Sequence, residues 1–427
     1  MFFEIENIGK VREARIEMRG ITVLAGYNST GKSTFGKALY CIFNAFCESD
    51  KKIMNERKND IEDIILQLTR PPVVRVAQLG RLVDSILEKI DSPQDIPKII
   101  QDAIEQKVIP PPRTDDLVDI LSKNICEYIR IEDEEIQKVI LRQYLAAEFE
   151  GQTTHVNFPR QQGKVSLSFK NRQLNLTIFI KGEECVGYTN NNVSIINRAF
   201  YMDTPFVMDS IGLPYPQHHN RYPHRRNTSR YNHRNQILKY LQSAYGSNKN
   251  TSEEVLGKQK LKSVLECIVS TVPGDFSNTD SGGIGFQEQG LECPLELLNV
   301  SAGMKPFLIF RRLLEAGEIK ERDVLILDEP EIHLHPDWQI KFAEALVLLQ
   351  KAFDLTILLT THSPYFLQAI EVFSAQQRIQ KDRCNYYYLE NDKEGYCHVE
   401  EVTEDTDGIY QKLARPFQTL RNVHYAE

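Results

Sequence analysis

A glycine-rich segment of this chain has the residue types and spacing that bind phosphate groups. Residues 26–34 read Gly-Tyr-Asn-Ser-Thr-Gly-Lys-Ser-Thr, which fits the phosphate-loop pattern G-x-x-x-x-G-K-[ST]. The glycines let successive backbone N–H groups turn toward phosphate oxygens, and a following helix adds its unpaired N-terminal donors. In this pattern the lysine reaches the β- and γ-phosphates, and the next hydroxyl ligates Mg²⁺. We therefore expect nucleotide-binding residues at Gly26, Asn28, Ser29, Thr30, Gly31, Lys32, Ser33 and Thr34, with Ser33 also a metal ligand.

Two acids follow an apolar run later in the chain. Residues 324–327 are Val-Leu-Ile-Leu, and Asp328, Glu329 and Pro330 come next. Ligands of open α/β sheets bind at the C-terminal edge, where both carboxylates would emerge. Asp328 is expected to hold Mg²⁺, and Glu329 to orient and deprotonate an attacking water. A lone acid pair is usually a solvated strand end, but the upstream phosphate loop favours the catalytic interpretation.

Two further segments could complete such a site. His362 follows the next apolar strand, residues 355–359, which places it at the same sheet edge, in reach of a γ-phosphate. A single histidine is more often a structural hydrogen-bonder, yet this position favours a phosphate sensor. Residues 301–305 read Ser-Ala-Gly-Met-Lys. They are not diagnostic alone, but a serine and a glycine opening a helix would form another anion-binding helix N-terminus.

The spacing of apolar residues predicts the elements that position these motifs. Residues 21–25 form a short apolar run before the glycine loop, and apolar residues then recur at helical spacing from Phe35 to Phe46. This predicts a strand, a loop and a helix that begins near Lys32. Alternation between Val165 and Tyr188 predicts a hairpin or meander. A helix over 337–353 joins the two later strands, so we expect an α/β fold.

Two long segments are expected to be insertions. Residues 53–149 keep a helical pattern that proline runs interrupt, without a sustained heptad repeat. The window 217–239 is rich in arginine, histidine and tyrosine, and no acid occurs between residues 210 and 252. It could be a connector that pairs within the molecule or a site for nucleic acid or a phage component. A metal site is a third interpretation, based on His218, His219, His224 and His233.

Composition narrows the class of protein. The chain has 427 residues, 41% hydrophobic and 26% charged, with a net charge of −8, as expected for a globular protein that is not a basic nucleic-acid coat. Acids near the N-terminus argue against a signal peptide, and no apolar run is long enough to span a membrane. We expect a cytoplasmic protein without membrane contact. Its eight cysteines include no Cys-x-x-Cys pair, which indicates reduced thiols.

Taken in order, the motifs resemble an ABC-type ATPase head. They are the phosphate loop, Ser-x-Gly-x-Lys at 301–305, Asp-Glu-Pro-Glu-x-His-Leu-His-Pro at 328–336, and Thr-His-Ser at 361–363. The closer likeness is to the SMC-like AAA-family ATPases related to the overcoming-lysogenisation-defect proteins. It covers about residues 1–47 and 285–415. The fold class expected from it is α/β, an ABC-type P-loop ATPase head with a mixed central sheet, an antiparallel β lobe and helical insertions.

The resemblance also implies cofactors and a partner. Two heads would dimerise, alone or in a larger multiple, around two ATP molecules with Mg²⁺. Ser301 and Gly303 of one protomer would complete the site that Lys32, Asp328 and Glu329 build in the other. Residues 331–336 would lie where the heads communicate, and His362 would be the switch histidine. Lys305 would add positive charge beside the partner's nucleotide.

The sequence departs from the family in several places. The signature reads Val-Ser-Ala-Gly-Met-Lys over 300–305 instead of Leu-Ser-Gly-Gly-Gln, and the Q-loop glutamine has only Gln152 as a weak candidate. Without heptads and Cys-x-x-Cys, the insertion is not a zinc-hooked arm. The stretch after His362 is too short for the toprim nuclease domain of the lysogenisation family, so any cutting would be done by a partner in trans.

These patterns give an expected layout along the chain. Residues 1–49 would be the N-terminal part of the head, 50–150 a helical insertion and 151–204 the antiparallel β part. Residues 205–275 would be a basic linker and helical insertion, and 276–427 the C-terminal part of the head.

The leading hypothesis is a sensor or regulatory ATPase that controls a separate effector, a nuclease or toxin, in bacterial anti-phage defence. One alternative is a nuclease whose site lies among the histidines and acids of the insertions. Another is a DNA-repair or DNA-end-binding SMC-like ATPase without a toxic effector, which would contact DNA through Arg225, Arg226 and Arg230.

Overall fold

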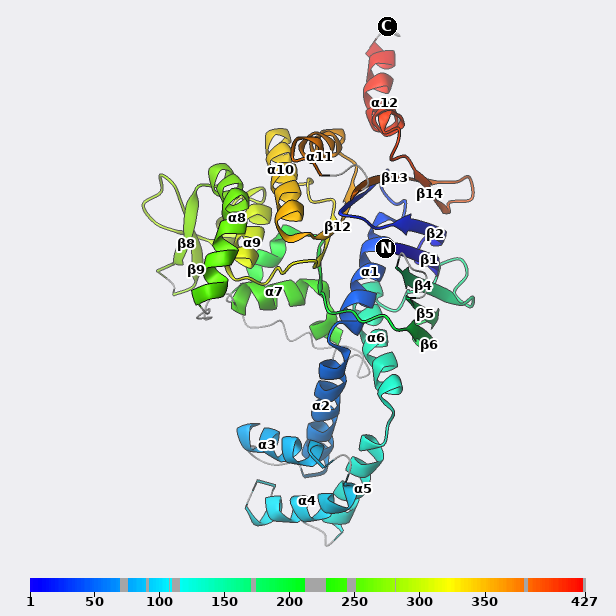
Figure 1. Ribbon diagram of the computed structural model, residues 1–427, viewed down its shortest axis with the longest axis vertical. Coiled ribbons are helices and arrows are strands. Elements are labelled where there is room, and N and C mark those ends of the chain that lie inside the picture. Colours follow the sequence, from blue (N-terminus) through cyan, green and yellow to red (C-terminus); the bar gives the residue numbers. More distant parts are fainter. Residues whose placement is uncertain are drawn as a thin grey trace. The chain divides into compact units, whose positions relative to one another are not determined.

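The structure is a computed structural model (Figure 1). It describes residues 1–69, 76–89, 92–106, 108–109, 116–169, 174–211, 228–243, 251–280, 282–379 and 383–424. The chain divides into two compact units, one formed by Met1–Cys47 with Leu141–Glu427 and the other by Glu48–Ile140.

A six-stranded sheet lies at the centre of the first unit, counted over the described residues. Its order is β14-β13-β3-β12-β11-β7. The strands are β3 (Ile21–Gly26), β7 (Ala199–Met202), β11 (Val324–Asp328), β12 (Thr356–Thr361), β13 (Cys384–Asn391) and β14 (Cys397–Glu401). All neighbours pair in parallel except β13 and β14. The strands before the three motifs, β3, β12 and β11, are therefore adjacent and end at one edge.

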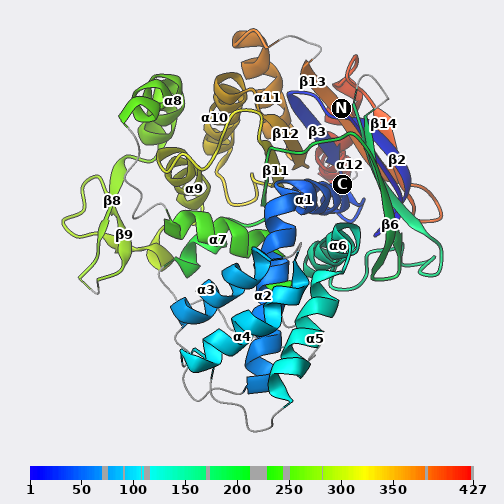
Figure 2. The ribbon, with the colours of Figure 1, turned by 60° about the horizontal axis from the view of Figure 1, so that its bottom comes forward.

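Helices cover both faces of this sheet (Figure 2). On one face α1 (Lys32–Phe46) packs closely, because a Cβ on Gly36 would lie 3.0 Å from Ile326 Cγ2. On the other face Leu325 and Leu327 share a core with α10 (Pro336–Phe353) and α11 (Pro364–Gln376). Alternate residues of β11 thus face opposite helical layers, which is why the strand is apolar throughout.

A second sheet, five-stranded within the described part, is antiparallel. Its order is β2-β1-β4-β5-β6. The strands are β1 (Phe2–Ile8), β2 (Val11–Glu17), β4 (Gly163–Ser168), β5 (Asn175–Lys181) and β6 (Glu184–Asn191). The predicted hairpin or meander between Val165 and Tyr188 is formed by β4, β5 and β6. The fold class is therefore the expected α/β class, with a mixed central sheet, an antiparallel lobe and added helices.

The remaining elements of the first unit surround these sheets. A small sheet holds β8 (Gly274–Asn278), β9 (Ile284–Glu288) and β10 (Leu295–Glu296). The other helices are α6 (Asp133–Phe149), which begins in the second unit, α7 (His233–Ser243), α8 (Thr251–Thr271), α9 (Met304–Glu315) and α12 (Asp407–His424), with the short 3-10 helices η2 (Pro205–Ser210), η4 (Thr228–Tyr231) and η5 (Leu297–Asn299). Among the described residues, no helix has both the length and the apolar character needed to cross a membrane.

The second unit is helical and has its own core. It contains α2 (Ser49–Thr69), α3 (Val76–Leu87), a 3-10 turn η1 (Pro93–Asp95), α4 (Ile96–Glu105) and α5 (Leu117–Ile129). Isoleucine and leucine side chains from these helices form one buried cluster. The buried guanidinium of Arg57 donates to the carbonyls of Ile129 and Ile131 and to Asp133, at 2.9, 2.6 and 2.8 Å. Arg57 thereby joins α2 to the connection between α5 and α6.

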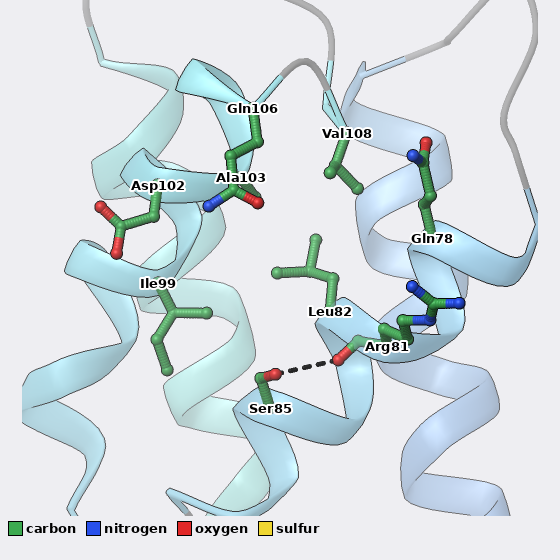
Figure 3. A pocket seen from close by; sticks show the side chains of 9 residues that line it. All are labelled: Gln78, Arg81, Leu82, Ser85, Ile99, Asp102, Ala103, Gln106 and Val108. Carbon is green, nitrogen blue, oxygen red and sulfur yellow. Dashed lines mark hydrogen bonds between the residues drawn. The ribbon is translucent and has the colours of Figure 1, made fainter.

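A pocket of about 370 Å³ lies between α3 and α4 (Figure 3). Its lining combines the apolar side chains of Leu82, Ile99 and Val108 with polar side chains that include Gln78 and Gln106. None of the residues expected to bind nucleotide lines it.

His233, the first residue of α7, is a buried link between three elements of the first unit. Its Nδ1 lies 2.7 Å from Glu148 Oε2 in α6, and its Nε2 lies 2.9 Å from Asp203 Oδ1, just after β7. Arg234 forms a further ion pair with Asp203. Burial opposes the charged ring, but the carboxylates of Asp203 and Glu148 beside it raise the pKa of His233 to about 9.

For His233, these contacts favour pairing within the molecule over a metal site. Both of its ring nitrogens already face carboxylates, and no cluster suited to a metal ion occurs among the described residues. His218, His219 and His224 lie outside the described residues, as do Arg225 and Arg226 of the basic window.

The pKa of His233 predicts a pH-dependent stability. A group whose pKa is higher in the folded state than in the unfolded state stabilises the fold. For His233 this contribution is complete below the unfolded pKa of about 6.5 and is lost as the pH rises through the pKa of the folded state. We expect the free energy of unfolding, measured by denaturant titration, to fall between pH 6.5 and 9 by at most about 3 kcal/mol from this group. His233→Gln should be less stable at pH 6.5 and should lose most of this slope. An unchanged slope in the variant would contradict the assignment.

Candidate active site

The backbone angles of the phosphate loop suit the binding of an anion. Ser29 and Gly31 have left-handed φ angles of 68° and 91° on either side of Thr30, and such alternation forms an anion-binding nest. Gly31 is also the N-cap of α1, and no side chain in the described part of the chain caps that helix. At the start of the loop, a Cβ on Gly26 would lie 2.3 Å from the Leu389 carbonyl oxygen. Only glycine fits there.

Side-chain contacts fix this loop from several directions. Thr30 is buried and donates to the Tyr27 carbonyl at 2.9 Å, and Asn391 Nδ2 donates to the Ser29 carbonyl at 3.3 Å. Lys10 Nζ donates to Ser29 Oγ. The remaining predicted binding residues complete the turn: Asn28 and Ser33 are exposed, and Thr34 N donates to the Gly31 carbonyl at 3.0 Å. The contacts of Lys10 and Asn391 were not evident from the motif.

Lys32 is almost fully buried, with 4% of its surface exposed, and its ammonium has three oxygen neighbours. It donates to the carbonyls of Gly26 at 3.0 Å and Tyr27 at 2.8 Å, and it lies 3.2 Å from Glu329 Oε1. The structure thus joins the phosphate-loop lysine directly to the predicted catalytic base.

Asp328 and Glu329 are oriented by the strands on both sides of β11. Asp328 Oδ1 accepts a hydrogen bond from Thr360 Oγ1 at 2.6 Å, and its Oδ2 accepts one from the Tyr201 hydroxyl at 3.2 Å. Glu329 has a φ of 49° and donates its N–H to Thr360 Oγ1 at 3.0 Å. A left-handed glutamate is strained, and such strain is concentrated at functional sites. The turn follows the strand immediately and coincides with the Glu329–Lys32 ion pair.

His362 lies beside the same glutamate. Its Nδ1 is 3.6 Å from Glu329 Oε1 and 4.0 Å from Glu331 Oε1. The close approach of His362, with help from Lys32, lowers the pKa of Glu329 despite its partial burial, and the same contact raises the pKa of His362. An ionised Glu329 at neutral pH is the form that can accept a proton from water.

The segment expected to act as a signature opens α9. Ser301 is exposed, whereas Gly303 is buried at the N-cap. A Cβ on Gly303 would lie 3.1 Å from the His333 carbonyl oxygen and 3.4 Å from the Trp338 ring. Glycine therefore permits close packing of this segment on the turn after Glu329.

Lys305, which was expected beside the partner's nucleotide, is buried in this conformation. Only 2% of its surface is exposed, its ammonium is ion-paired with Asp209, and it lies over the Phe206 ring. Its charge is neutralised inside the chain, so it does not project toward a second nucleotide. The sequence did not show this because Asp209 lies far from Lys305 along the chain.

Sequence reasoning also missed residues at the end of β7. Tyr201 orients Asp328, and Asp203 follows the strand beside it. The run Ala-Phe-Tyr-Met-Asp over 199–203 has the same form as the run that ends in Asp328, so it could have indicated a third acid at this edge. Gln152, the weak Q-loop candidate, lies exposed in the turn after α6.

Comparisons with known proteins concern parts of this site. Residues 171–368 match the family model described as "AAA domain, putative AbiEii toxin, Type IV TA system". This segment includes the acids, His362 and the Ser301 segment, but not the phosphate loop. It is similar to an AAA-type ATPase domain.

One curated relative is the Septu protein PtuA of Bacillus thuringiensis, which is 35% identical over 106 residues. The match covers 23% of this chain and 26% of that protein, so the chain spans about a quarter of the relative's length.

The chain is also similar to two solved SMC heads. One is the SmcHead bound to the C-winged helix domain of ScpA, with a TM-score of 0.45, 10% identity and coverage of 94% of this chain and 97% of that one. The other is the SMC head domain from Thermotoga maritima, with a TM-score of 0.38, 11% identity and coverage of 94% and 98%.

Proposed function

We propose that this chain hydrolyses ATP with Mg²⁺ and that it acts as a regulatory ATPase. The observation that supports this most directly is one cluster at the sheet edge. Lys32 lies 3.2 Å from Glu329, and His362 lies 3.6 Å from the same carboxylate, each residue following a different parallel strand. A lysine at a glycine loop, a strand-end acid pair and a histidine are the parts that phosphoryl transfer needs.

The residues present fit ATP and Mg²⁺. The nest at Ser29–Gly31 and the uncapped start of α1 suit phosphate oxygens, and the exposed Ser33 hydroxyl and the oriented Asp328 carboxylate are hard oxygen ligands. Bound Mg²⁺ would neutralise charge on the phosphates. Asn28, Thr30 and Thr34 would act through the shape of the loop.

Glu329 is assigned as the base and His362 as the sensor of the γ-phosphate. Glu329 would take a proton from water as the water oxygen bonds to the γ-phosphorus and the bond from that phosphorus to the β–γ bridging oxygen breaks. Because Glu329 is paired with Lys32 in this conformation, a γ-phosphate that engages Lys32 would release the carboxylate toward the water. Substrate binding would thus free the base.

We further propose a dimer of heads around ATP, alone or within a larger multiple. Four residues at the sheet edge and in the Ser301 segment each have a large, exposed apolar side chain three positions away. Phe206 follows Asp203, Ile332 follows Glu329 and Tyr365 follows His362, whereas Leu298 precedes Ser301. Exposed apolar side chains beside these four residues suit burial by a second copy. Ser301 and Gly303 would then complete the partner's site.

The setting we propose is bacterial anti-phage defence, in which the nucleotide state holds or releases a separate nuclease or toxin. Support comes from the resemblance to the overcoming-lysogenisation-defect proteins, from the AbiEii description of the matching family model and from the similarity to a Septu protein.

Lys32→Ala should abolish ATP binding. Without the ammonium, the β- and γ-phosphates lose their charge-assisted hydrogen bonds, and the affinity for a fluorescent ATP analogue should fall more than about 100-fold. Lys351→Ala, in α10, is the matched control, because that lysine is exposed and bonds only Gln377 among its described side-chain contacts. Equal binding by the two variants would contradict the role of Lys32.

Glu329→Gln should bind ATP but turn it over about 10²–10³-fold more slowly, since the amide cannot accept the proton. Steady-state phosphate release measures turnover, and light scattering after size exclusion measures mass. With Mg-ATP the variant should accumulate as a homodimer or a larger multiple, whereas Lys32→Ala should not. Normal turnover by Glu329→Gln would rule out Glu329 as the base.

A further inference from the structure

Glu331, in the turn after β11, is a buried carboxylate beside the predicted sensor histidine. Only 2% of its surface is exposed. Its Oε1 accepts hydrogen bonds from the Thr361 hydroxyl and from the backbone N–H of His362, the latter at 3.1 Å. Its Oε2 is also buried and has no hydrogen-bond partner among the described residues. A buried, half-satisfied carboxylate is costly for a fold and calls for a reason beyond packing.

The turn that carries Glu331 is tied to the segment of His362 at two points. The first is Glu331 itself, through Thr361 and His362. The second is Gln339. Its Oε1 accepts a hydrogen bond from Ser363 Oγ at 2.7 Å, and its Nε2 donates one to the Leu334 carbonyl at 3.1 Å. Within the turn, Leu334 N donates to the Glu331 carbonyl at 2.9 Å. These hydrogen bonds hold the turn and residues 361–363 together.

The opposite side of this turn contacts the Ser301 segment. The His333 carbonyl oxygen approaches Gly303 so closely that a Cβ there would lie 3.1 Å away. The imidazole of His333 also packs edge-on against Phe206, with ring centroids 5.0 Å apart. Glu331 therefore stands between two places that are expected to contact different nucleotides of a dimer.

We infer that Glu331 is a positioning residue that fixes His362 at the phosphate-binding edge and couples it to the turn packed on Gly303. This inference rests on the proposed ATPase function. Glu331 acts through His362 and does not touch the nucleotide. Its loss should therefore weaken the response to the γ-phosphate and spare the contacts to the α- and β-phosphates.

The test compares Glu331→Ala and Glu331→Gln with a control at the other end of β11. Asp323 is equally buried, at 2%, and accepts hydrogen bonds from the backbone N–H groups of Arg198 at 3.1 Å and Lys320 at 2.8 Å. Burial raises the pKa of both carboxyl groups. Asp323→Ala thus reproduces the loss of a buried, hydrogen-bonded carboxylate away from the site.

Two quantities are measured at a temperature where each variant is folded. They are kcat for ATP, and the ratio of the Kd for ADP to the Kd for ATP, which falls when ATP binding is weakened selectively. Glu331→Ala should lower kcat about 10–100-fold and the ratio about tenfold, with ADP affinity unchanged within about twofold. Glu331→Gln, which keeps a carbonyl oxygen for both donors, should restore most of kcat and of the ratio. Asp323→Ala should keep both quantities while losing stability.

A double-mutant cycle with His362→Ala tests whether Glu331 acts through the histidine. In the His362→Ala background, Glu331→Ala should not lower the ratio further. If Glu331→Ala does not fold, Thr361→Val replaces it, because valine has the same shape and lacks the hydroxyl that donates to Oε1. That variant should lower the ratio in the same direction.

Three outcomes would overturn the inference: an unchanged ratio, an equal loss of ATP and ADP affinity, or an additive effect in the cycle. Failure of the proposed function is a separate result. In that case the unmodified chain would release no phosphate from ATP, while the Kd ratio would still report on Glu331.

Discussion

The site depends on the parallel register of β3, β12 and β11. Thr361 pairs with Ala25 and Asp328 with Thr360, so the strands end together and their next residues meet at one edge. That alignment allows Lys32 to reach Glu329, and it allows the Thr360 hydroxyl to serve both Asp328 and the Glu329 N–H. A slip of one residue would turn the alternating side chains of β11 to the wrong helical layers. Packing of the core and assembly of the site are thus the same constraint.

The residues of the proposed nucleotide site lie on short local patterns, and this explains which features could be predicted. The phosphate loop, the acid pair and His362 each follow an apolar strand within a few residues, and α1 begins at Lys32 as its apolar spacing predicts. Ion pairs between distant segments leave no such pattern. Lys305 is neutralised by Asp209, and His233 lies between Glu148 and Asp203. Only the folded chain brings these groups together, so the pairing of Lys305 was not foreseen, and the pairing of His233 within the molecule was one of three open interpretations.

In this conformation the carboxylate of the proposed base, Glu329, is already paired with other side chains. Glu329 is paired with Lys32 and His362, and Glu331 fixes the backbone of His362 from within the core. A phosphate that engages Lys32 would compete with Glu329, and one that engages His362 would act on a segment bonded to the turn at Gly303. The same few contacts thus connect substrate binding, activation of water and the surface that we propose for a second copy.

The most direct test of the proposed mechanism is to determine a structure of the chain with Mg²⁺ and a non-hydrolysable ATP analogue. The account predicts that the β- and γ-phosphates lie at the start of α1, with Lys32 bonded to them and separated from Glu329. Mg²⁺ should lie within reach of Ser33 and Asp328, and His362 should face the γ-phosphate. A nucleotide bound elsewhere, or an intact Lys32–Glu329 ion pair beside bound phosphates, would contradict it.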